Sequence, residues 1–568
     1  MKTTDKSGIS NFIQQCLLHG MNHIVCSPGS RNAPFIIAID EHPDLNAIVI
    51  HDERSAAFYA LGMALQLKEP VGIVCTSGSA MLNYYPAVAE AYYQCVPIVV
   101  ISADRPIEWI DHGDGQTIVQ TGVYRNHIRY EASIVEFIES DSERNKMNDE
   151  ISDAFEQCNG NWKGPIHFNA PVSEPLYNTC EIEYKKNIFY KNKRQDTFHF
   201  SQTERKSISG LWSGSERKMI ICGQFNGHND DLLNRLVEIS GDPSVVVLVE
   251  NTSNLVSDNF VHCIDRTLCS IQKSEVEEFQ PEILISIGGA VISKRIKTFL
   301  RQANIREHWK VGFEFPDMDT YKVKTESFQC EPSDFLSSLL ELDLVQNVAT
   351  FGAKWKQKDI LVQQKLPEIH KKLKFSDLKV FECLLKLLPK SSNLHMGNSS
   401  VVRYCQLFDP NNSVRYFANR GTSGIDGCTS TACGSALTDR EKLNVLISGD
   451  VSFFYDSNAL WSNHLTGNLR IIVIHNNGGG IFKIIDGPSS VKQLDTYFEA
   501  RHEYSAEHLC TTFNIEYFVA ESMGDIQNVI DAFFMDSEND RPKLLEINTP
   551  SEINDIVFKD FFNLAQSS

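Results

Sequence analysis

Two stretches near the carboxyl end, ISGDVSFFYDSNALW (residues 447–461) and IIVIHNNGGGIF (residues 471–482), share one pattern. Each begins with an apolar run typical of a buried strand and stops at small polar residues, Asp450 in the first and Asn476 in the second. The helix-like YDSNALWSNHL between them is long enough for a crossover between parallel neighbours. The pattern therefore predicts that both side chains project from one edge of a parallel sheet.

Such an edge would gather oxygen ligands. A carboxylate from Asp450, an amide oxygen from Asn476 and a backbone carbonyl from the glycine turn suit Mg²⁺, which takes its other ligands from water and phosphates. Glycines 478–480 also let the backbone approach an anion closely. A Gly-Asp pair after a strand is by itself usually a turn. Its combination with the spaced Asn-Asn-Gly favours a site for metal and phosphate.

The rest of the chain alternates strands and helices in three blocks. Apolar runs in residues 1–180 include HIVCSPGS, NAIVIHDE, GIVCTSGSA and PIVVISADRP; a second block (190–355) has KMIICGQ, SVVVLVE and EILISIGG; a third (375–568) has SVRYFANRG, LNVLISGD, LRIIVIHNN and PKLLEINTP. Continuous rather than alternating hydrophobicity is typical of buried parallel strands. We predict an α/β protein of three doubly wound parallel-sheet domains, with a polar linker around 178–202 and a connecting helix in KWKQKDILVQQKLPEIHKKLK.

Composition excludes several classes of function. The 568 residues are too many for one core. A net charge of −20 argues against binding to nucleic acid or to anionic membranes. No apolar run approaches the roughly 18 residues of a membrane helix, and the opening MKTTDKSGISNFIQQCLLHG lacks a signal-peptide block, so we expect a cytoplasmic protein without membrane insertion. Fifteen cysteines without paired CxxC spacing predict reduced thiols.

Gly449-Asp450 followed by Asn476-Asn477 resembles the diphosphate-binding motif of the thiamine diphosphate (ThDP) enzymes. The resemblance implies Mg²⁺, with Mn²⁺ as an alternative, held by Asp450, the Asn476 side chain and the Gly478 carbonyl. It also implies a pyrimidine-binding first domain, a cofactor-free middle domain and a diphosphate-binding last domain. Most members have Gly-Asp-Gly at the first stop, whereas this chain has Gly-Asp-Val-Ser, which points to a particular branch.

ThDP chemistry requires an acid that shares a proton with N1′ of the aminopyrimidine. Glu53 follows a predicted strand and begins a helix with Ala56, Ala57 and Ala60 on its packed face. Alone it would be an acid favoured at a helix start; with the metal motif we predict that it is catalytic. The resemblance also assigns Ile425 as the apolar wedge that bends the cofactor. The remaining implied cofactor contacts are Ser77, Gly78, Ser423, Gly424, Gly449, Val451, Ser452, Gly478, Gly479, Ile481 and Phe482.

Basic and hydroxyl residues repeatedly follow predicted strand ends. They are Ser30, Arg31, Arg105, Lys294, Arg295, Ser399, Arg403 and Arg420. Each taken singly would be an ordinary surface or capping residue. The guanidinium fork pairs bidentately with carboxylates, so their number predicts substrates with three or four carboxylates in total.

The motifs SPGSRNAPF, HDERSAAFYALGMA, ISKR, GNSSVVR and NRGTSGIDG closely resemble the 2-succinyl-5-enolpyruvyl-6-hydroxy-3-cyclohexene-1-carboxylate synthase family of menaquinone biosynthesis. That resemblance implies a transferase that decarboxylates 2-oxoglutarate and adds the resulting succinyl-semialdehyde carbanion to isochorismate in a 1,4 sense. Gln116 would act near the reacting centre. Isochorismate would face Ser30, Arg31, Arg105, Lys294 and Arg295, whereas Ser399, Arg403 and Arg420 would hold the succinyl part.

Two residues depart from the pattern of this family. His475 stands where an asparagine is expected, and we interpret it as strand-end packing because Mg²⁺ prefers oxygen. Gly115 replaces a polar residue before Gln116 and removes one potential substrate hydrogen bond.

Three alternatives stay open at this point. They are another ThDP lyase such as an acetolactate synthase, a catalytically inactive scaffold of the same fold, and a dinucleotide-binding protein. The first leaves the cations unexplained, the second predicts loss of Glu53 or Asp450, and the third lacks a GxGxxG after the first strand. The family also implies a homodimer or a dimer of dimers, in which Glu53 meets a cofactor bound mainly by the partner's third domain.

Overall fold

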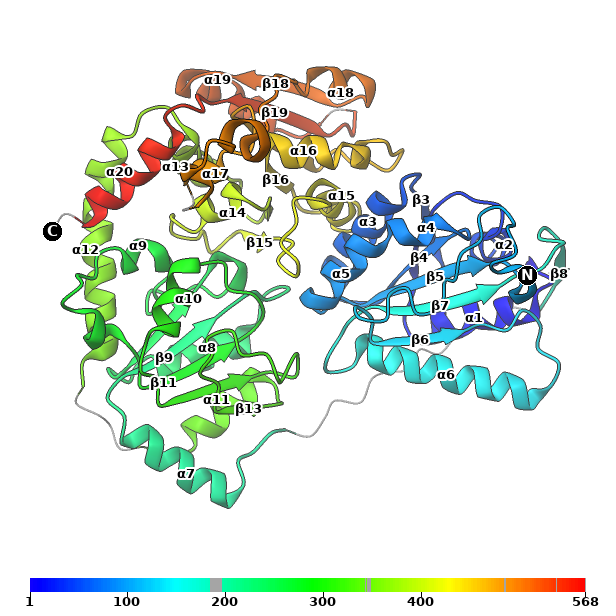
Figure 1. Cartoon of the computed structure of the whole chain (residues 1–568), viewed down its shortest axis with the longest axis horizontal. Coiled ribbons are helices and arrows are strands. Elements are labelled where there is room, and N and C mark those ends of the chain that lie inside the picture. The colour runs from blue at the N-terminus through cyan, green and yellow to red at the C-terminus, as the bar shows by residue number, and fades with distance from the viewer. Residues whose placement is uncertain (184–196, 343, 345–348, 485–486, 538, 567–568) are drawn as a thin grey trace.

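The computed structural model describes residues 1–183, 197–342, 344, 349–484, 487–537 and 539–566 (Figure 1). Its framework is three parallel sheets, each with helices packed around it, which confirms the predicted α/β class. Residues 184–196 of the predicted linker, and with them the predicted start of the second block at residue 190, lie outside the described residues. None of the helices in the described ranges is long and apolar enough to cross a bilayer.

The first sheet has the strand order β3-β2-β4-β5-β7-β6. Its strands are β2 (His23–Cys26), β3 (Asn46–Val49), β4 (Val71–Cys75), β5 (Ile98–Asp104), β6 (Tyr130–Ser133) and β7 (Ile166–Pro171). Its helices are α1 (Ser7–Leu18), α2 (Ala33–Asp40), α3 (Glu53–Leu67), α4 (Ser79–Asn83), α5 (Tyr85–Gln94) and α6 (Asp141–Asn159). A separate antiparallel pair joins β1 (Lys2–Thr4) to β8 (Thr179–Glu181).

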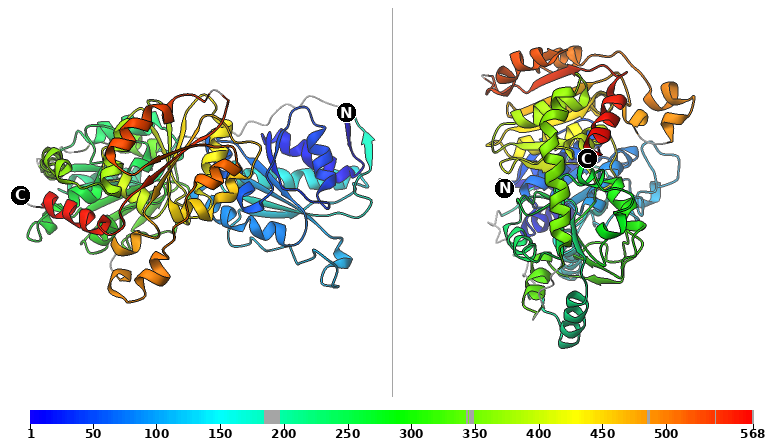
Figure 2. Two further views of the ribbon diagram at one scale, coloured as in Figure 1. Left: turned by 90° about the horizontal axis from the view of Figure 1, so that it is seen from above. Right: turned by 90° about the vertical axis from the view of Figure 1, so that its left-hand side faces the viewer.

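The middle sheet has the order β10-β9-β11-β12-β13. Its strands are β9 (Lys218–Cys222), β10 (Val245–Val249), β11 (Ile283–Ile287), β12 (Glu307–Val311) and β13 (Glu326–Phe328), and its helices are α7 (Gln202–Ser213), α8 (Asp230–Ile239), α9 (Ile264–Leu268), α10 (Lys294–Arg301) and α11 (Pro332–Leu340). The predicted connecting helix is α12 (Phe351–Lys372), which contacts β10 of this sheet and α20 (Asn554–Gln566) of the third block. Figures 1 and 2 show α12 beside α20.

The third sheet has the order β15-β14-β16-β17-β19-β18. Its strands are β14 (Asn393–Met396), β15 (Arg415–Phe417), β16 (Asn444–Gly449), β17 (Leu469–His475), β18 (Glu516–Ala520) and β19 (Lys543–Asn548). Its helices are α13 (Asp377–Leu387), α14 (Ser400–Cys405), α15 (Cys428–Thr438), α16 (Asp450–Tyr455), α17 (Ile481–Ile484), α18 (Glu507–Thr512), α19 (Met523–Phe534) and α20 (Asn554–Gln566).

Helices α3 and α15 pack side by side where the first and third blocks meet (Figure 1). A Cβ on Gly62 would lie 2.0 Å from the carbonyl oxygen of Thr431, and one on Gly434 would lie 2.0 Å from that of Tyr59. Glycine therefore allows the two backbones to touch, and one apolar core includes residues of both blocks. Because α3 is buried along most of its length, it is apolar on all sides.

Two local predictions were wrong. The run NAIVIHDE was expected to form a buried strand, but β3 is an edge strand and 49% of Val49 is exposed. The stretch YDSNALWSNHL was expected to form one crossover helix. Instead α16 begins at Asp450 and ends at Tyr455, and a 3-10 turn follows over Ser457–Leu460. The break falls at Asp456, whose carboxylate accepts hydrogen bonds from the N–H and hydroxyl of Ser430.

Candidate active site

Asp450 and Asn476 follow neighbouring strands and emerge at the same edge of the third sheet. Strands β16 and β17 are parallel, with Gly449 opposite Ile474. The Oδ2 atom of Asp450 accepts a 3.0 Å hydrogen bond from the N–H of Gly478. The arrangement predicted from the two quoted stretches is therefore confirmed as a feature of the fold.

The Asn476 side chain has an oxygen atom that could bind a cation. Its Nδ2 atom donates a 2.8 Å hydrogen bond to Oδ2 of Asp377, which fixes the orientation of the amide. Its Oδ1 atom is buried and has no hydrogen-bond partner among the residues that the structure describes. Leaving such an atom unsatisfied is costly, and a magnesium ion would satisfy it. The described ranges contain no cluster of three or more His, Cys, Asp or Glu that could hold a metal, so amide and backbone oxygens would have to complete the set.

The turn after β17 requires glycine. Gly478 has a φ of +145°, and a Cβ there would lie 2.6 Å from the carbonyl oxygen of Glu499. The Gly478 carbonyl accepts a 2.9 Å hydrogen bond from the N–H of Gly480 and keeps a second lone pair. The residue types present at this edge therefore fit Mg²⁺ with a diphosphate. The other predicted cofactor contacts of this edge lie in or next to these two strand-end turns. They are Gly449, Val451, Ser452, Gly479, Ile481 and Phe482.

Burial dominates the electrostatics of this edge. It raises the pKa of Asp450, whereas the N–H of Val451 at 2.6 Å and His502, whose Nε2 lies 3.7 Å from Oδ2, oppose that shift. A bound cation would favour the ionised carboxylate. His475 is a buried strand-end residue, and its Nδ1 lies 2.7 Å from Oε1 of Glu546. Burial lowers the pKa of His475, but the hydrogen bond to Glu546 and the charge of Asp450 outweigh it and raise the pKa overall.

The loop that carries Ser423, Gly424 and Ile425 is tied down by side chains from two blocks. Ser452 donates a 2.6 Å hydrogen bond to the Ile425 carbonyl, and Asn398 donates one of 2.6 Å to the Gly424 carbonyl. Glu90 of α5, in the first block, accepts hydrogen bonds from the N–H groups of residues 421 and 422 at 2.7 and 2.6 Å. Sequence patterns did not reveal Asn398 or Glu90, because both act on a loop distant in the chain.

Glu53 is the first residue of α3 and is half-buried. Asp52 caps this helix by accepting a 3.0 Å hydrogen bond from the N–H of Ser55. Burial raises the pKa of Glu53, and the neighbouring charge of Asp52 adds to that effect. In the described part of the chain no hydrogen bond or ion pair joins Glu53 to Asp450 or Asn476.

Ser77 and Gly78 follow β4, and the loop carrying Gln116 lies against them. Gly78 has a φ of +83°, and a Cβ there would lie 3.1 Å from the Gln116 backbone. The N–H of Gly78 donates a 2.9 Å hydrogen bond to Oε1 of Gln120, a residue that the sequence patterns did not single out. The predicted cofactor turn and the predicted catalytic glutamine are therefore brought together.

The predicted substrate residues form two separate groups. In the first block Arg31 is buried, and burial lowers the pKa of its guanidinium; the positive charge of Arg105 contributes further to that shift. Arg105 donates to the carbonyl of Gly115 at 3.1 Å, whereas Ser30 is exposed beside Arg31. The second group contains the cations of the middle and third blocks.

In this second group Arg403 donates a 2.5 Å hydrogen bond to the Ser399 carbonyl, and Arg420 donates one of 2.7 Å to Oδ1 of Asn398. Burial and then the charge of Arg420 lower the pKa of Arg403. Lys294 and Arg295 begin α10 and are exposed, and the Arg295 guanidinium lies 4.1 Å from the Phe562 ring centroid. Among the described residues no hydrogen bond or ion pair joins this group to Arg31 or Arg105.

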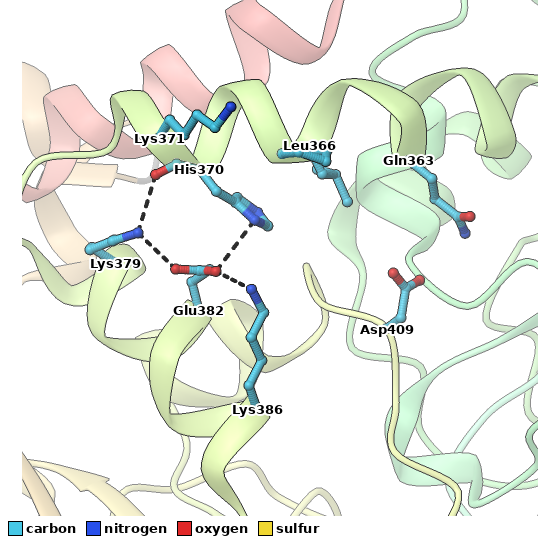
Figure 3. A pocket seen from close by; sticks show the side chains of 9 residues that line it. Gln363, Leu366, His370, Lys371, Lys379, Glu382, Lys386 and Asp409 are labelled. Carbon is cyan, nitrogen blue, oxygen red and sulfur yellow. Dashed lines mark hydrogen bonds and ion pairs between the residues drawn. The ribbon is translucent and has the colours of Figure 1, made fainter. Parts of the chain in front are cut away.

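Two cavities lie outside these strand ends. One of about 1200 Å³ is lined by residues of all three blocks, including Lys163, Lys310 and Arg420. The other, of about 430 Å³, lies between α12 and α13 (Figure 3). There the single Glu382 carboxylate accepts hydrogen bonds from both Lys379 and Lys386, so each of these ammonium groups already has an acidic partner. Neither cavity includes Asp450, Asn476 or Glu53 in its lining.

Residues 8–123 match the family described as thiamine pyrophosphate enzyme, N-terminal TPP binding domain, and residues 194–396 match the middle domain of thiamine pyrophosphate. Together with three parallel sheets and their strand-end turns, these matches define the chain as a thiamine diphosphate enzyme. Proteins named 2-succinyl-5-enolpyruvyl-6-hydroxy-3-cyclohexene-1-carboxylate synthase match it over nearly its full length. The protein from Flavobacterium johnsoniae is 42% identical, covering 97% of this chain and 98% of the relative. Those from Christiangramia forsetii and Flavobacterium psychrophilum are 41% and 40% identical, covering 98% and 97% of this chain and 98% of each relative. The chain belongs to the 2-succinyl-5-enolpyruvyl-6-hydroxy-3-cyclohexene-1-carboxylate synthase family.

Proposed function

We propose that this chain decarboxylates 2-oxoglutarate and transfers the remaining four-carbon unit to isochorismate by 1,4-addition, as a cytoplasmic enzyme of menaquinone biosynthesis. One observation carries the proposal: relatives whose name states this product are 40–42% identical to the chain over 97–98% of its length. The free state of all fifteen cysteines agrees with a reducing compartment.

Asp450, Asn476 and the Gly478 carbonyl would hold Mg²⁺ and, through it, the cofactor diphosphate. The buried Oδ1 of Asn476, which has no hydrogen-bond partner in the described part of the chain, supports this role. Bound thiamine diphosphate would supply the nucleophilic carbon and hold the electron pair released when CO₂ leaves. Ile425 would contact the cofactor, and the hydrogen bond from the Ser452 hydroxyl to the Ile425 carbonyl would hold this residue in place.

Glu53 would hold the proton shared with N1′ of the aminopyrimidine. Burial raises the pKa of Glu53, which favours its protonated form relative to an exposed glutamate and suits a carboxyl group that shares a proton. Because Glu53 makes no hydrogen bond or ion pair to the diphosphate residues of its own chain in the described ranges, we propose that it serves the site of a partner in a homodimer, or in a dimer of dimers.

The first cationic group would bind isochorismate, and the second would contribute to the binding of both substrates. Ser30, Arg31 and Arg105 would face the isochorismate carboxylates, with Gln116 beside the reacting centre. Ser399, Arg403 and Arg420 would hold the succinyl carboxylate of 2-oxoglutarate. We also propose that Lys294 and Arg295 face isochorismate, although they lie with the second group; association of two chains would then bring both groups to one site.

Turnover assays with ThDP and Mg²⁺ separate this function from its nearest rival. We expect 2-oxoglutarate to be consumed to product only when isochorismate is present. Consumption of pyruvate, with 2-oxoglutarate left untouched, would instead indicate an acetolactate-synthase-like enzyme.

A further inference from the structure

A buried chain of hydrogen bonds links two parts of the predicted site in the first block. Gln120 accepts a hydrogen bond from the Gly78 N–H at 2.9 Å and donates one to Oδ1 of Asn169 at 2.8 Å. Asn169 in turn donates a 2.8 Å hydrogen bond to Oδ2 of Asp104, and Asp104 accepts one of 2.8 Å from the N–H of Arg105. This series of hydrogen bonds through Gln120, Asn169 and Asp104, called the relay below, therefore runs from Gly78 in the predicted cofactor turn to Arg105, a predicted substrate residue.

The three side chains of this relay are almost inaccessible to solvent. Gln120, Asn169 and Asp104 are 0%, 3% and 1% exposed, so water cannot replace a lost partner. Further bonds support the same loop: Ser102 donates to Oδ1 of Asn169 at 2.8 Å, and Glu131 accepts a 2.8 Å hydrogen bond from the N–H of Gly122. Residues 105–122 are thus fixed near both of their ends.

The direction of each bond is set by the ends of the relay. Both terminal groups, the N–H of Gly78 and the N–H of Arg105, are donors that cannot reverse. Each amide accepts a hydrogen bond on one side and donates one on the other, whereas a carboxylate accepts on both sides. Two amides and one carboxylate therefore satisfy every hydrogen bond between two terminal donors. A relay without a carboxylate must place two donors face to face, whichever way the amides turn. A relay with two carboxylates places acceptors face to face.

We propose that Asn169 is a positioning residue that fixes the loop of residues 105–122 relative to Gly78, so that Arg105 and Gln116 stay in place for isochorismate. The inference rests on the proposed function for the identity of that substrate. It differs from a purely structural role because it predicts an effect on one substrate and not on the other. The cations assigned to 2-oxoglutarate, such as Arg403, lie in another block, and within the described ranges no hydrogen bond or ion pair joins them to the relay.

The test moves the single carboxylate along the relay. Asp104→Asn leaves no carboxylate, and we expect the KM for isochorismate to rise about tenfold, as for the loss of a buried hydrogen bond, with the KM for 2-oxoglutarate unchanged. The double variant Asn169→Asp with Asp104→Asn places the carboxylate at position 169 and again satisfies every bond. It should return the KM for isochorismate to within about threefold of wild type. A double variant as impaired as Asp104→Asn, or equal changes in both KM values, would overturn the proposal.

Hydrogen–deuterium exchange provides a readout that does not depend on activity. In Asp104→Asn, peptides containing Gly78 and residues 105–122 should exchange faster, and the double variant should restore their protection. Unchanged exchange in Asp104→Asn would also overturn the relay. If wild type turns over neither substrate but the exchange pattern appears, the proposed function fails and the relay stands.

Discussion

The amide nitrogen of Asn476 donates a 2.8 Å hydrogen bond to Oδ2 of Asp377, a residue 99 positions earlier in the chain. The other oxygen of Asp377 accepts a 2.5 Å hydrogen bond from the hydroxyl of Thr549. Asp377 therefore determines which end of the Asn476 amide is left for a cation, although it is not itself one of the proposed ligands.

Replacing Asp377 should weaken metal binding. In Asp377→Ala the Asn476 amide is free to rotate, and we expect the Mg²⁺ concentration for half-maximal ThDP binding to rise about tenfold, as is usual for residues that orient metal ligands. Thr549→Val is the matched control, because it removes the other hydrogen bond and leaves that of Asn476 in place. Equal Mg²⁺ dependence in Asp377→Ala and wild type, measured by titration, would argue against this role.

Replacing Gly478 should weaken ThDP binding because of a steric clash, in addition to backbone strain. Gly478→Ala adds a methyl group 2.6 Å from the carbonyl oxygen of Glu499, so the turn must shift and ThDP affinity should fall at least about tenfold. Gly487→Ala is a control: its φ of +102° is also positive, and no atom of the described residues lies within 4 Å of the added carbon. Calorimetry on both variants should show lost ThDP binding only for Gly478→Ala; similar losses in both would attribute the effect to strain.

The fold class and the positions of Asp450 and Asn476 at the ends of neighbouring strands could be predicted because their signals are local. Asp450 and Asn476 each follow an apolar run directly, and parallel neighbours bring such positions to one edge. Asp377, Glu90 and Asn169 could not be found in this way, since each acts on a residue far along the chain and has no distinctive flanking pattern. The exposure of β3 was missed for a related reason: an apolar run does not show whether its strand lies at a sheet edge.

Removing the acid of Glu53 should slow the chemistry without weakening cofactor binding. In Glu53→Gln the amide has no acidic proton to share with N1′ of the aminopyrimidine. We therefore expect kcat to fall by about 10² to 10⁴, the usual contribution of a general acid or base. Affinity for ThDP should change little, because the diphosphate residues are untouched. Asp52→Asn provides the control: it alters the adjacent helix cap and should keep most activity. Normal turnover by Glu53→Gln would refute the assignment.

Asp456 should make folding stability depend on pH. It accepts hydrogen bonds from the N–H and hydroxyl of Ser430, and burial raises its pKa from 3.8 to about 7. The folded state therefore binds the Asp456 proton more tightly than the unfolded state does. The resulting contribution to the free energy of unfolding is complete below about pH 4 and is lost as the pH rises to about 7. Asp456→Asn, in which the Ser430 hydroxyl can reverse, removes this dependence. Its Tm should rise relative to wild type between about pH 5 and about pH 8. Parallel curves of Tm against pH for the two proteins would contradict this prediction.

Activity after co-expression of two inactive chains, one carrying Glu53→Gln and the other Asp450→Ala, tests whether Glu53 acts across a dimer. If Glu53 acts on a cofactor held by the partner's Asp450, a mixed dimer has one site with both lesions and one intact site. Random pairing should then restore about a quarter of the wild-type activity. If both residues serve one site within a single chain, every site carries a lesion, and the mixture should be as inactive as either variant alone.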